Sequence, residues 1–220
     1  MKWCDQILRY HFSLRPDLIL PEGIEWLMPY EDPETQSCMT SFYNRFYNDT
    51  EKRTFILGIN PGRFGAGLTG VPFTDPIRLA QLGIENAFSK KQELSSVFMY
   101  EMIEALGGVE PFYSRFYISS LSPLGFVKAG KNYNYYDDPN LIRIVKPFII
   151  KHIETQLTFG ADLTRVFCLG QGKNFEFLQK LNNEHGWWER VIPLPHPRWV
   201  MQYRLKRKDE FIGEYAEALG

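Results

Sequence analysis

The sequence predicts an α/β protein of three layers, with a mostly parallel four-stranded central sheet between two layers of helices. Four short apolar runs have the length of strands, at 54–57, 115–121, 165–170 and 190–194. Segments with helical spacing separate them, and this alternation is typical of a parallel sheet. Because parallel strands are joined by crossovers, helices should cover both faces.

Helices are predicted from apolar spacing and from signals at their ends. In the first fifty residues, proline-punctuated segments suggest short helices around 3–12, 22–28 and 35–47, an N-terminal extension packed on the domain. Asp138-Pro139 resembles an N-cap followed by proline, and apolar spacing continues from there to Gly160. The other predicted helices are 77–82, 93–106, 171–181 and 201–218. Residues 126–138 are expected to form a loop.

Length and composition favour an ordinary globular chain. With 220 residues, 44% apolar and 23% charged, residues 1–220 are expected to form a single domain. The chain has no run of eighteen apolar residues and no signal-peptide core at its start, so we expect no membrane contact and an intracellular, cytoplasmic location. Three widely spaced cysteines suggest reduced thiols, and no metal or cofactor is expected.

The charge is unevenly distributed, although the net charge is only −1. Residues 1–50 hold four basic and eight acidic residues, whereas the remainder holds 21 basic and 18 acidic residues. Residues 196–208 contain five basic residues and no acidic one. Such a run is either a solvated helix face or a footprint for phosphate groups. The five residues are Arg198, Arg204, Lys206, Arg207 and Lys208.

The stretch from Gly58 to Phe73 carries the strongest sign of chemistry. It follows a buried strand, so its polar side chain, Asn60, should lie at the mouth of the sheet. Glycines allow the backbone to approach a ligand, and Phe64 and Phe73 suit stacking on a flat ring. A loop that only turns the chain is the alternative interpretation. The stretch has neither the P-loop pattern nor the dinucleotide-binding one.

Four residues fall at predicted strand ends: Asn60, Ser120, Gly170 and His196. If the strands are parallel, these ends face one crevice. A single histidine is more often structural than catalytic, but prolines on both sides of His196 fix its loop, and a rigid loop suits the positioning of a side chain.

Together these motifs resemble the uracil-DNA glycosylase superfamily, and within it the single-strand-selective monofunctional (SMUG) branch. The family's first motif, GMNPGPFGMAQTGVPFG, is similar to residues 58–74, which read GINPGRFGAGLTGVPFT. Its HPSPR motif resembles a shortened His196-Pro197-Arg198. The family segments HNLCPL and VGVGR are similar to residues 119–124 and 169–173. The match covers about 55–205 and leaves the first fifty residues unplaced.

The resemblance implies hydrolysis of the bond between a damaged base and deoxyribose, after the base is flipped into a pocket. On the family pattern Asn60 would orient the attacking water, and His196 would donate to the base oxygen on which negative charge develops. Phe73 would stack on the base, while Gly62 and Phe64 shape the pocket.

The resemblance also assigns contacts with the nucleic acid. Arg198 would enter the duplex and fill the vacated space, and Lys206, Arg207 and Lys208 would contact phosphates. Arg204 is included in this DNA-binding group for its place in the basic run.

Three departures from the family pattern concern specificity. Ser120 stands where the family has a base-reading Asn, so the amide that offers both a donor and an acceptor to a uracil edge is absent. Asn132 or Asn134 is a candidate to reach inward. The shortened second motif predicts a shorter wedge loop at Arg198. Residues 66–68, beginning with Ala66, alter the pocket wall near the 5-position of the base.

The sequence therefore predicts a monomeric, monofunctional DNA glycosylase acting in base-excision repair on uracil or a related deaminated or oxidised base. No lysine is placed as a Schiff-base nucleophile, so strand cleavage is not predicted. Two alternatives stay open: a non-catalytic nucleic-acid-binding protein that retains the pocket, and a hydrolase of free nucleosides or nucleotides.

Overall fold

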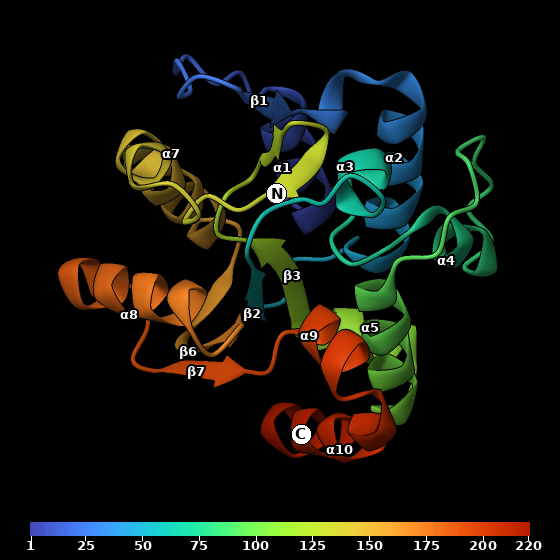
Figure 1. Ribbon diagram of the computed structural model, residues 1–220. Helices are drawn as coiled ribbons and strands as arrows, with labels where there is room; N and C mark the ends of the chain where they lie inside the picture. The colour runs from blue at the N-terminus through green and yellow to red at the C-terminus, as the bar shows by residue number, and fades with distance from the viewer.

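The computed structural model describes residues 1–220 and contains a central sheet of four parallel strands. The spatial order is β3 (Phe116–Ser120), β2 (Arg53–Gly58), β6 (Ala161–Leu169) and β7 (Val191–Leu194). All neighbouring pairs are parallel. In Figure 1, α7 (Pro139–Leu157) and α8 (Lys173–His185) lie to one side of these strands. This is the predicted three-layer fold.

Other helices cover the remaining sides of the sheet (Figure 1). They are α1 (Trp3–Phe12), α2 (Pro33–Phe46), α3 (Ala66–Thr69), α4 (Pro76–Gln81), α5 (Leu94–Ala105), α6 (Val109–Arg115), α9 (Pro197–Tyr203) and α10 (Lys208–Leu219). Two short 3-10 turns, η1 (Pro29–Glu31) and η2 (Leu205–Arg207), complete the helical elements. No helix is both long and apolar enough to cross a bilayer.

The strand register aligns the carboxyl ends that matter for the site. Gly58 at the end of β2 lies beside Ser120 at the end of β3, and Leu169 of β6 lies beside Leu194 of β7. The carboxyl ends of the four strands therefore lie along one edge, the usual ligand-binding edge of such a sheet.

A second, three-stranded antiparallel sheet was not predicted. It has the order β1 (Ile24–Leu27), β4 (Gly125–Lys128) and β5 (Lys131–Tyr133). The helix predicted at 22–28 is therefore wrong, because Trp26 pairs with Phe126 across the β1–β4 ladder, with the two ring centres 5.0 Å apart. A short isolated segment takes its structure from such a partner, which spacing along the chain does not show.

The loop predicted at 126–138 is also partly wrong, since β4 and β5 form a hairpin within it. Ala129 and Gly130 connect the strands with φ of 49° and 71°. Two consecutive positive φ values are typical of the tight turn that matches strand twist, and glycine provides one of them at little cost. The hairpin and the residue after it bring Lys131, Asn132 and Asn134 to the cavity at the sheet edge.

The helix predicted at 201–218 is split into α9, η2 and α10. Pro197 occupies the first turn of α9 and His196 caps it, so this helix begins earlier than expected. The chain leaves helical geometry at Arg204, where φ is −134°.

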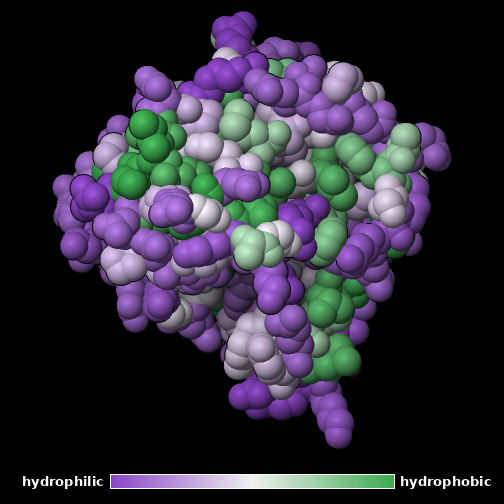
Figure 2. Space-filling model, turned by 45° about the horizontal axis from the view of Figure 1, so that its top comes forward, coloured by the Kyte–Doolittle hydropathy of each residue, from purple (hydrophilic) through white to green (hydrophobic).

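Figure 2 shows that the face turned toward the viewer is mostly hydrophilic, with hydrophobic residues in separate patches.

The first fifty residues pack into the same hydrophobic core as the rest of the chain. Trp3 is fully buried, and its ring lies 5.1 Å from that of Tyr117 and 6.1 Å from that of Phe55. The fully buried Arg53 forms an ion pair of 2.7 Å with Asp49. This extension consists of α1, β1, η1 and α2 with loops between them, and it contributes to the packing beneath the sheet.

Candidate functional site

A cavity of about 840 Å³ opens at the carboxyl edge of the parallel sheet. Eight of the predicted site residues line it: Asn60, Gly62, Phe64, Ala66, Phe73, Ser120, His196 and Arg198. They come from the loop after β2, the end of β3 and the start of α9. The structure therefore brings together residues that are far apart in the sequence.

Asn60 is held at the cavity by the backbone that follows β5. Its Nδ2 donates to the carbonyl of Tyr133 at 3.2 Å, and its Oδ1 accepts from the amide of Tyr135 at 3.2 Å. These two bonds determine the orientation of the amide, because one needs a donor and the other an acceptor. An amide oxygen has two acceptor positions, so Oδ1 retains one for a further donor.

His196 ends the loop after β7 and caps α9. Its Nδ1 accepts from the backbone N–H of Arg198 at 3.2 Å, which places the proton of the neutral ring on Nε2. Burial, together with the charge of Arg198, lowers the pKa of His196 to about 4. The ring is therefore neutral at pH 7 and has one N–H donor that the protein leaves unused.

Phe73, in the segment between β2 and α4, has an unusual backbone conformation. Its φ is 53°, in the left-handed region that bulky residues rarely adopt, and its ring centre lies 6.1 Å from that of His196. Gly58 explains how the ring fits, because a Cβ at that position would lie 3.0 Å from its edge. The strained residue is thus part of the cavity wall.

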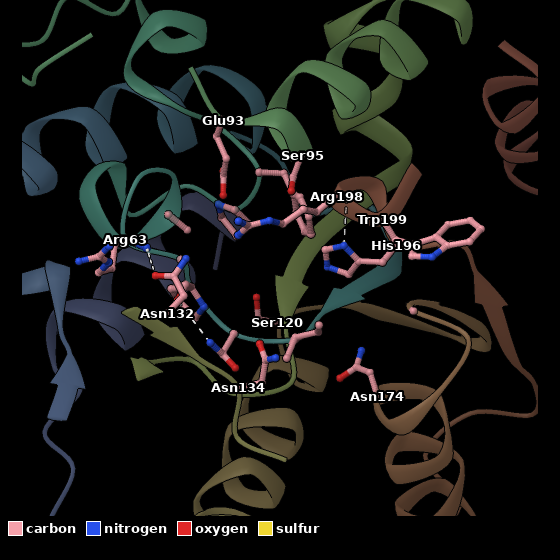
Figure 3. A pocket seen from close by; sticks show the side chains of 18 of the residues that line it. Arg63, Glu93, Ser95, Ser120, Asn132, Asn134, Asn174, His196, Arg198 and Trp199 are labelled. Atoms are coloured by element: carbon pink, nitrogen blue, oxygen red, sulfur yellow. Dashed lines mark hydrogen bonds between the residues drawn. The ribbon is translucent and has the colours of Figure 1, made fainter. Parts of the chain in front are cut away.

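Ser120 lies near the centre of the view in Figure 3, among the side chains that line the cavity, and is buried. Its hydroxyl makes no hydrogen bond within the protein, whereas its carbonyl lies 3.1 Å from Nε2 of the buried His152. Nearby Asn174 already uses both ends of its amide in hydrogen bonds within the protein. Its Nδ2 donates to the carbonyl of Leu169 at 3.1 Å, and its Oδ1 accepts from the Tyr135 hydroxyl. Ser120 therefore has hydrogen-bonding capacity free for a ligand.

The predicted basic group is divided by the structure. Arg198 is exposed at the cavity, but Arg204, Lys206 and Arg207 line a separate depression of about 310 Å³. Arg207 forms an ion pair with Glu210 at 2.7 Å, and Lys208 forms one with Glu101 at 2.6 Å. Two of the five cations are thus paired within the protein.

Sequence reasoning missed several polar residues of the cavity, notably Glu93. The carboxyl group of Glu93 faces the cavity and forms no ion pair (Figure 3). Burial and the charge of Asp75 raise its pKa to about 7, although Arg198 lowers it. No motif marked Glu93, because its position depends on how the segment before α5 folds over the glycine loop.

Asn132 and Asn134, the two candidates to reach inward, both line the cavity, although the hairpin before Asn134 was not predicted. Asn132 Oδ1 accepts from the backbone N–H of Arg63 at 3.1 Å, which ties the hairpin to the central loop. The Asn134 amide has no hydrogen-bond partner in the protein. Lys131 and Lys173 lie at the exposed border of the same cavity. No cluster of three His, Cys, Asp or Glu side chains has the arrangement of a metal site.

Comparison with known proteins identifies the family. The model of the uracil DNA glycosylase superfamily matches residues 45–220. The chain belongs to the uracil DNA glycosylase superfamily. A solved structure similar to it is the crystal structure of wild-type SMUG2 from Pedobacter heparinus, with 45% identity and a TM-score of 0.96. The match covers 99% of this chain and 97% of that one. No curated protein matches the sequence.

These findings confirm the predicted superfamily and its SMUG-like branch. The likeness to SMUG2 also includes the first fifty residues, which the motifs alone left unplaced. As a superfamily member, the chain has a uracil DNA glycosylase-type function with DNA as its partner.

Proposed function

We propose that this protein is a monofunctional glycosylase of base-excision repair, which takes a damaged base into the cavity and hydrolyses its N-glycosidic bond. The substrate would be uracil or a related deaminated or oxidised base. The observation that carries the proposal is that Asn60 and His196, from distant loops, line one cavity with an aromatic ring beside them. A cavity of about 840 Å³ is in the size range of small-molecule sites.

Asn60 would hold the attacking water. Its amide is fixed by Tyr133 and Tyr135, so the free acceptor position of Oδ1 has a defined direction. An amide is too weak a base to generate hydroxide, and positioning is therefore its main contribution. Most of the rate must come from stabilising the departing base.

His196 would stabilise that base as negative charge develops on its oxygen. The neutral ring offers Nε2–H, and a fixed donor of this kind is worth roughly 3–4 kcal/mol in comparable sites. Phe73 would stack on the base, with Gly62, Phe64 and Ala66 shaping the wall. Ser120 would provide a hydrogen bond to the base edge.

Arg198 and the basic run would act on the DNA itself. Arg198 is exposed at the cavity, as expected for a residue that fills the space left by the extruded base. Arg204, Lys206, Arg207 and Lys208 would contact phosphates. For Arg207 and Lys208, such contacts compete with Glu210 and Glu101. We further propose that residues 1–220 act as one monomeric domain.

The test is incubation with oligonucleotides carrying uracil, hydroxymethyluracil, xanthine or hypoxanthine, read with and without alkali. We expect alkali-dependent cleavage for at least one lesion, with strong losses in Asn60→Ala and His196→Ala. Asn183→Ala and His185→Ala, which lie outside the cavity, are matched controls. Cleavage of none of the lesions, or full activity of the two cavity variants, contradicts the mechanism. Cleavage without alkali contradicts the monofunctional assignment and implicates Lys131 or Lys173.

The same assay separates the alternatives. Salt-dependent DNA binding without base release favours a non-catalytic binding protein. Release from free nucleosides, unaffected by Arg198→Ala, favours a nucleoside hydrolase.

A further inference from the structure

Glu93 is a carboxyl group of the cavity that has no part in the proposed chemistry. Glu93 precedes α5 at its N-cap position, but its side chain does not cap the helix. The carboxyl group turns into the cavity instead (Figure 3), against Gly65 of the loop after β2. A carboxylate here lines the space that a nucleotide has to enter.

The loop beneath Glu93 is shaped to receive its carboxyl group. A Cβ at Gly65 would overlap Oε2 of Glu93, and a Cβ at Gly62 would lie 3.5 Å from Oε1. The same point at Gly62 lies 3.3 Å from Nδ2 of Asn132. Two polar groups, from different elements, thus converge above Gly62. Neither Glu93 Oε1 nor Asn132 Nδ2 has a hydrogen-bond partner in the protein.

The charged groups around Glu93 leave its carboxylate poorly compensated. Asp75, at the start of α4, accepts from the Glu93 backbone N–H at 2.9 Å and adds a like charge. Arg198 of α9 reaches toward Glu93 across the cavity but forms no ion pair with it (Figure 3). Other nearby cations, Arg63 and Lys91, lie over the ring of Phe64. His196 is neutral at pH 7.

We propose that Glu93 is a substrate-binding residue that acts in its neutral form, its protonated carboxyl group donating a hydrogen bond to an acceptor on the extruded base. The proposal rests on the proposed function, since it needs a nucleotide in the cavity. The raised pKa of Glu93, about 7, supports the proposal, because about half of the carboxyl groups keep their proton at pH 7 in the free protein. The phosphates of bound DNA add negative potential and favour retention further.

The inference predicts that binding of a flipped nucleotide takes up one proton. If only the protonated form accepts the base, the apparent dissociation constant rises about tenfold from pH 6 to pH 8. In Glu93→Gln the amide keeps the size and a donor of the neutral acid, so the pH dependence should disappear. Binding by this variant at pH 8 should then approach that of the wild type at pH 6.

The experiment measures binding of an oligonucleotide containing 2′-fluoro-2′-deoxyuridine, whose glycosidic bond resists cleavage, relative to the same oligonucleotide with thymidine. Fluorescence anisotropy is recorded from pH 6 to pH 8 for the wild type, Glu93→Gln and Glu85→Gln. Glu85 is exposed and outside the cavity, so its variant should keep the wild-type pH dependence.

Three results overturn the inference. They are a wild-type preference for the fluorinated nucleotide that does not change with pH, a slope that survives in Glu93→Gln, and no preference at pH 6. The alkali assay above measures base release separately. If lesions are cleaved while any of these binding results is found, the inference fails and the proposed function stands. If no lesion is cleaved, the proposed function fails.

Discussion

Gly58→Ala tests whether the position of the Phe73 ring sets the rate of base release. The new Cβ would lie 3.0 Å from Cε2 and Cζ of Phe73, whereas carbon atoms in good contact are about 3.5–4.0 Å apart. The ring must therefore withdraw by about 0.5–1 Å. The strained backbone of Phe73, with φ of 53°, restricts how it can do so.

Displacements of this size cost up to about a hundredfold in rate, so single-turnover base release should slow by about 10–100-fold. Overpacking should also destabilise the fold by about 1–3 kcal/mol, seen as a lower melting temperature. Phe73→Leu in the Gly58→Ala background should restore stability without restoring the rate. Gly213→Ala is the matched control, because a Cβ there meets no atom within 4 Å and should stabilise α10. A Gly58→Ala protein that releases base at the wild-type rate refutes the reasoning.

Three further predictions follow from charge and burial. Burial lowers the pKa of His11 to about 4 and that of His152 well below its usual value, so the unfolded chain binds more protons below pH 6.5. The free energy of unfolding should fall by about 3 kcal/mol or more between pH 7 and pH 4; a flat urea-denaturation profile would contradict this. Conversely, the raised pKa of Glu93 makes its ionisation destabilising as pH rises from 4.5 to 7. Glu93→Gln should therefore gain about 1–2 kcal/mol at pH 8 and little at pH 4.5, and equal stabilities of variant and wild type at pH 8 would count against it. Finally, Arg198→Ala should slow base release from duplex DNA more than from single strands, and equal slowing would argue against a role in filling the duplex.

The parallel sheet and its edge could be predicted from the sequence because their signals are local. Four apolar runs alternate with helical spacing, and parallel pairing then places Asn60, Ser120 and His196 at one edge whatever the details. The glycine-rich stretch from Gly58 to Phe73 was also predicted to line the site, and its residues Gly62, Phe64 and Phe73 do so. These inferences depend on strand direction and order, not on how individual side chains pack.

The hairpin at the opposite wall of the cavity could not be predicted, because it depends on pairing between distant segments, although Asn132 and Asn134 were candidates to reach inward from an expected loop. The β4–β5 hairpin carries Asn132 and Asn134 to the site, and it is held in the small sheet by β1, about a hundred residues earlier in the chain. Glu93 reaches the site only because Gly65 has no Cβ to occupy the same space. No spacing rule reports such contacts between elements.

The most direct test of the account is a crystal structure with DNA that contains the non-cleavable 2′-fluoro-2′-deoxyuridine. We expect the base inside the cavity against Phe73, with a carbonyl oxygen about 2.7–3.1 Å from His196 Nε2 and a water on Asn60 Oδ1. A base that stays stacked in the DNA, or that enters the cavity without contacting His196, would contradict base excision by Asn60 and His196 in this cavity.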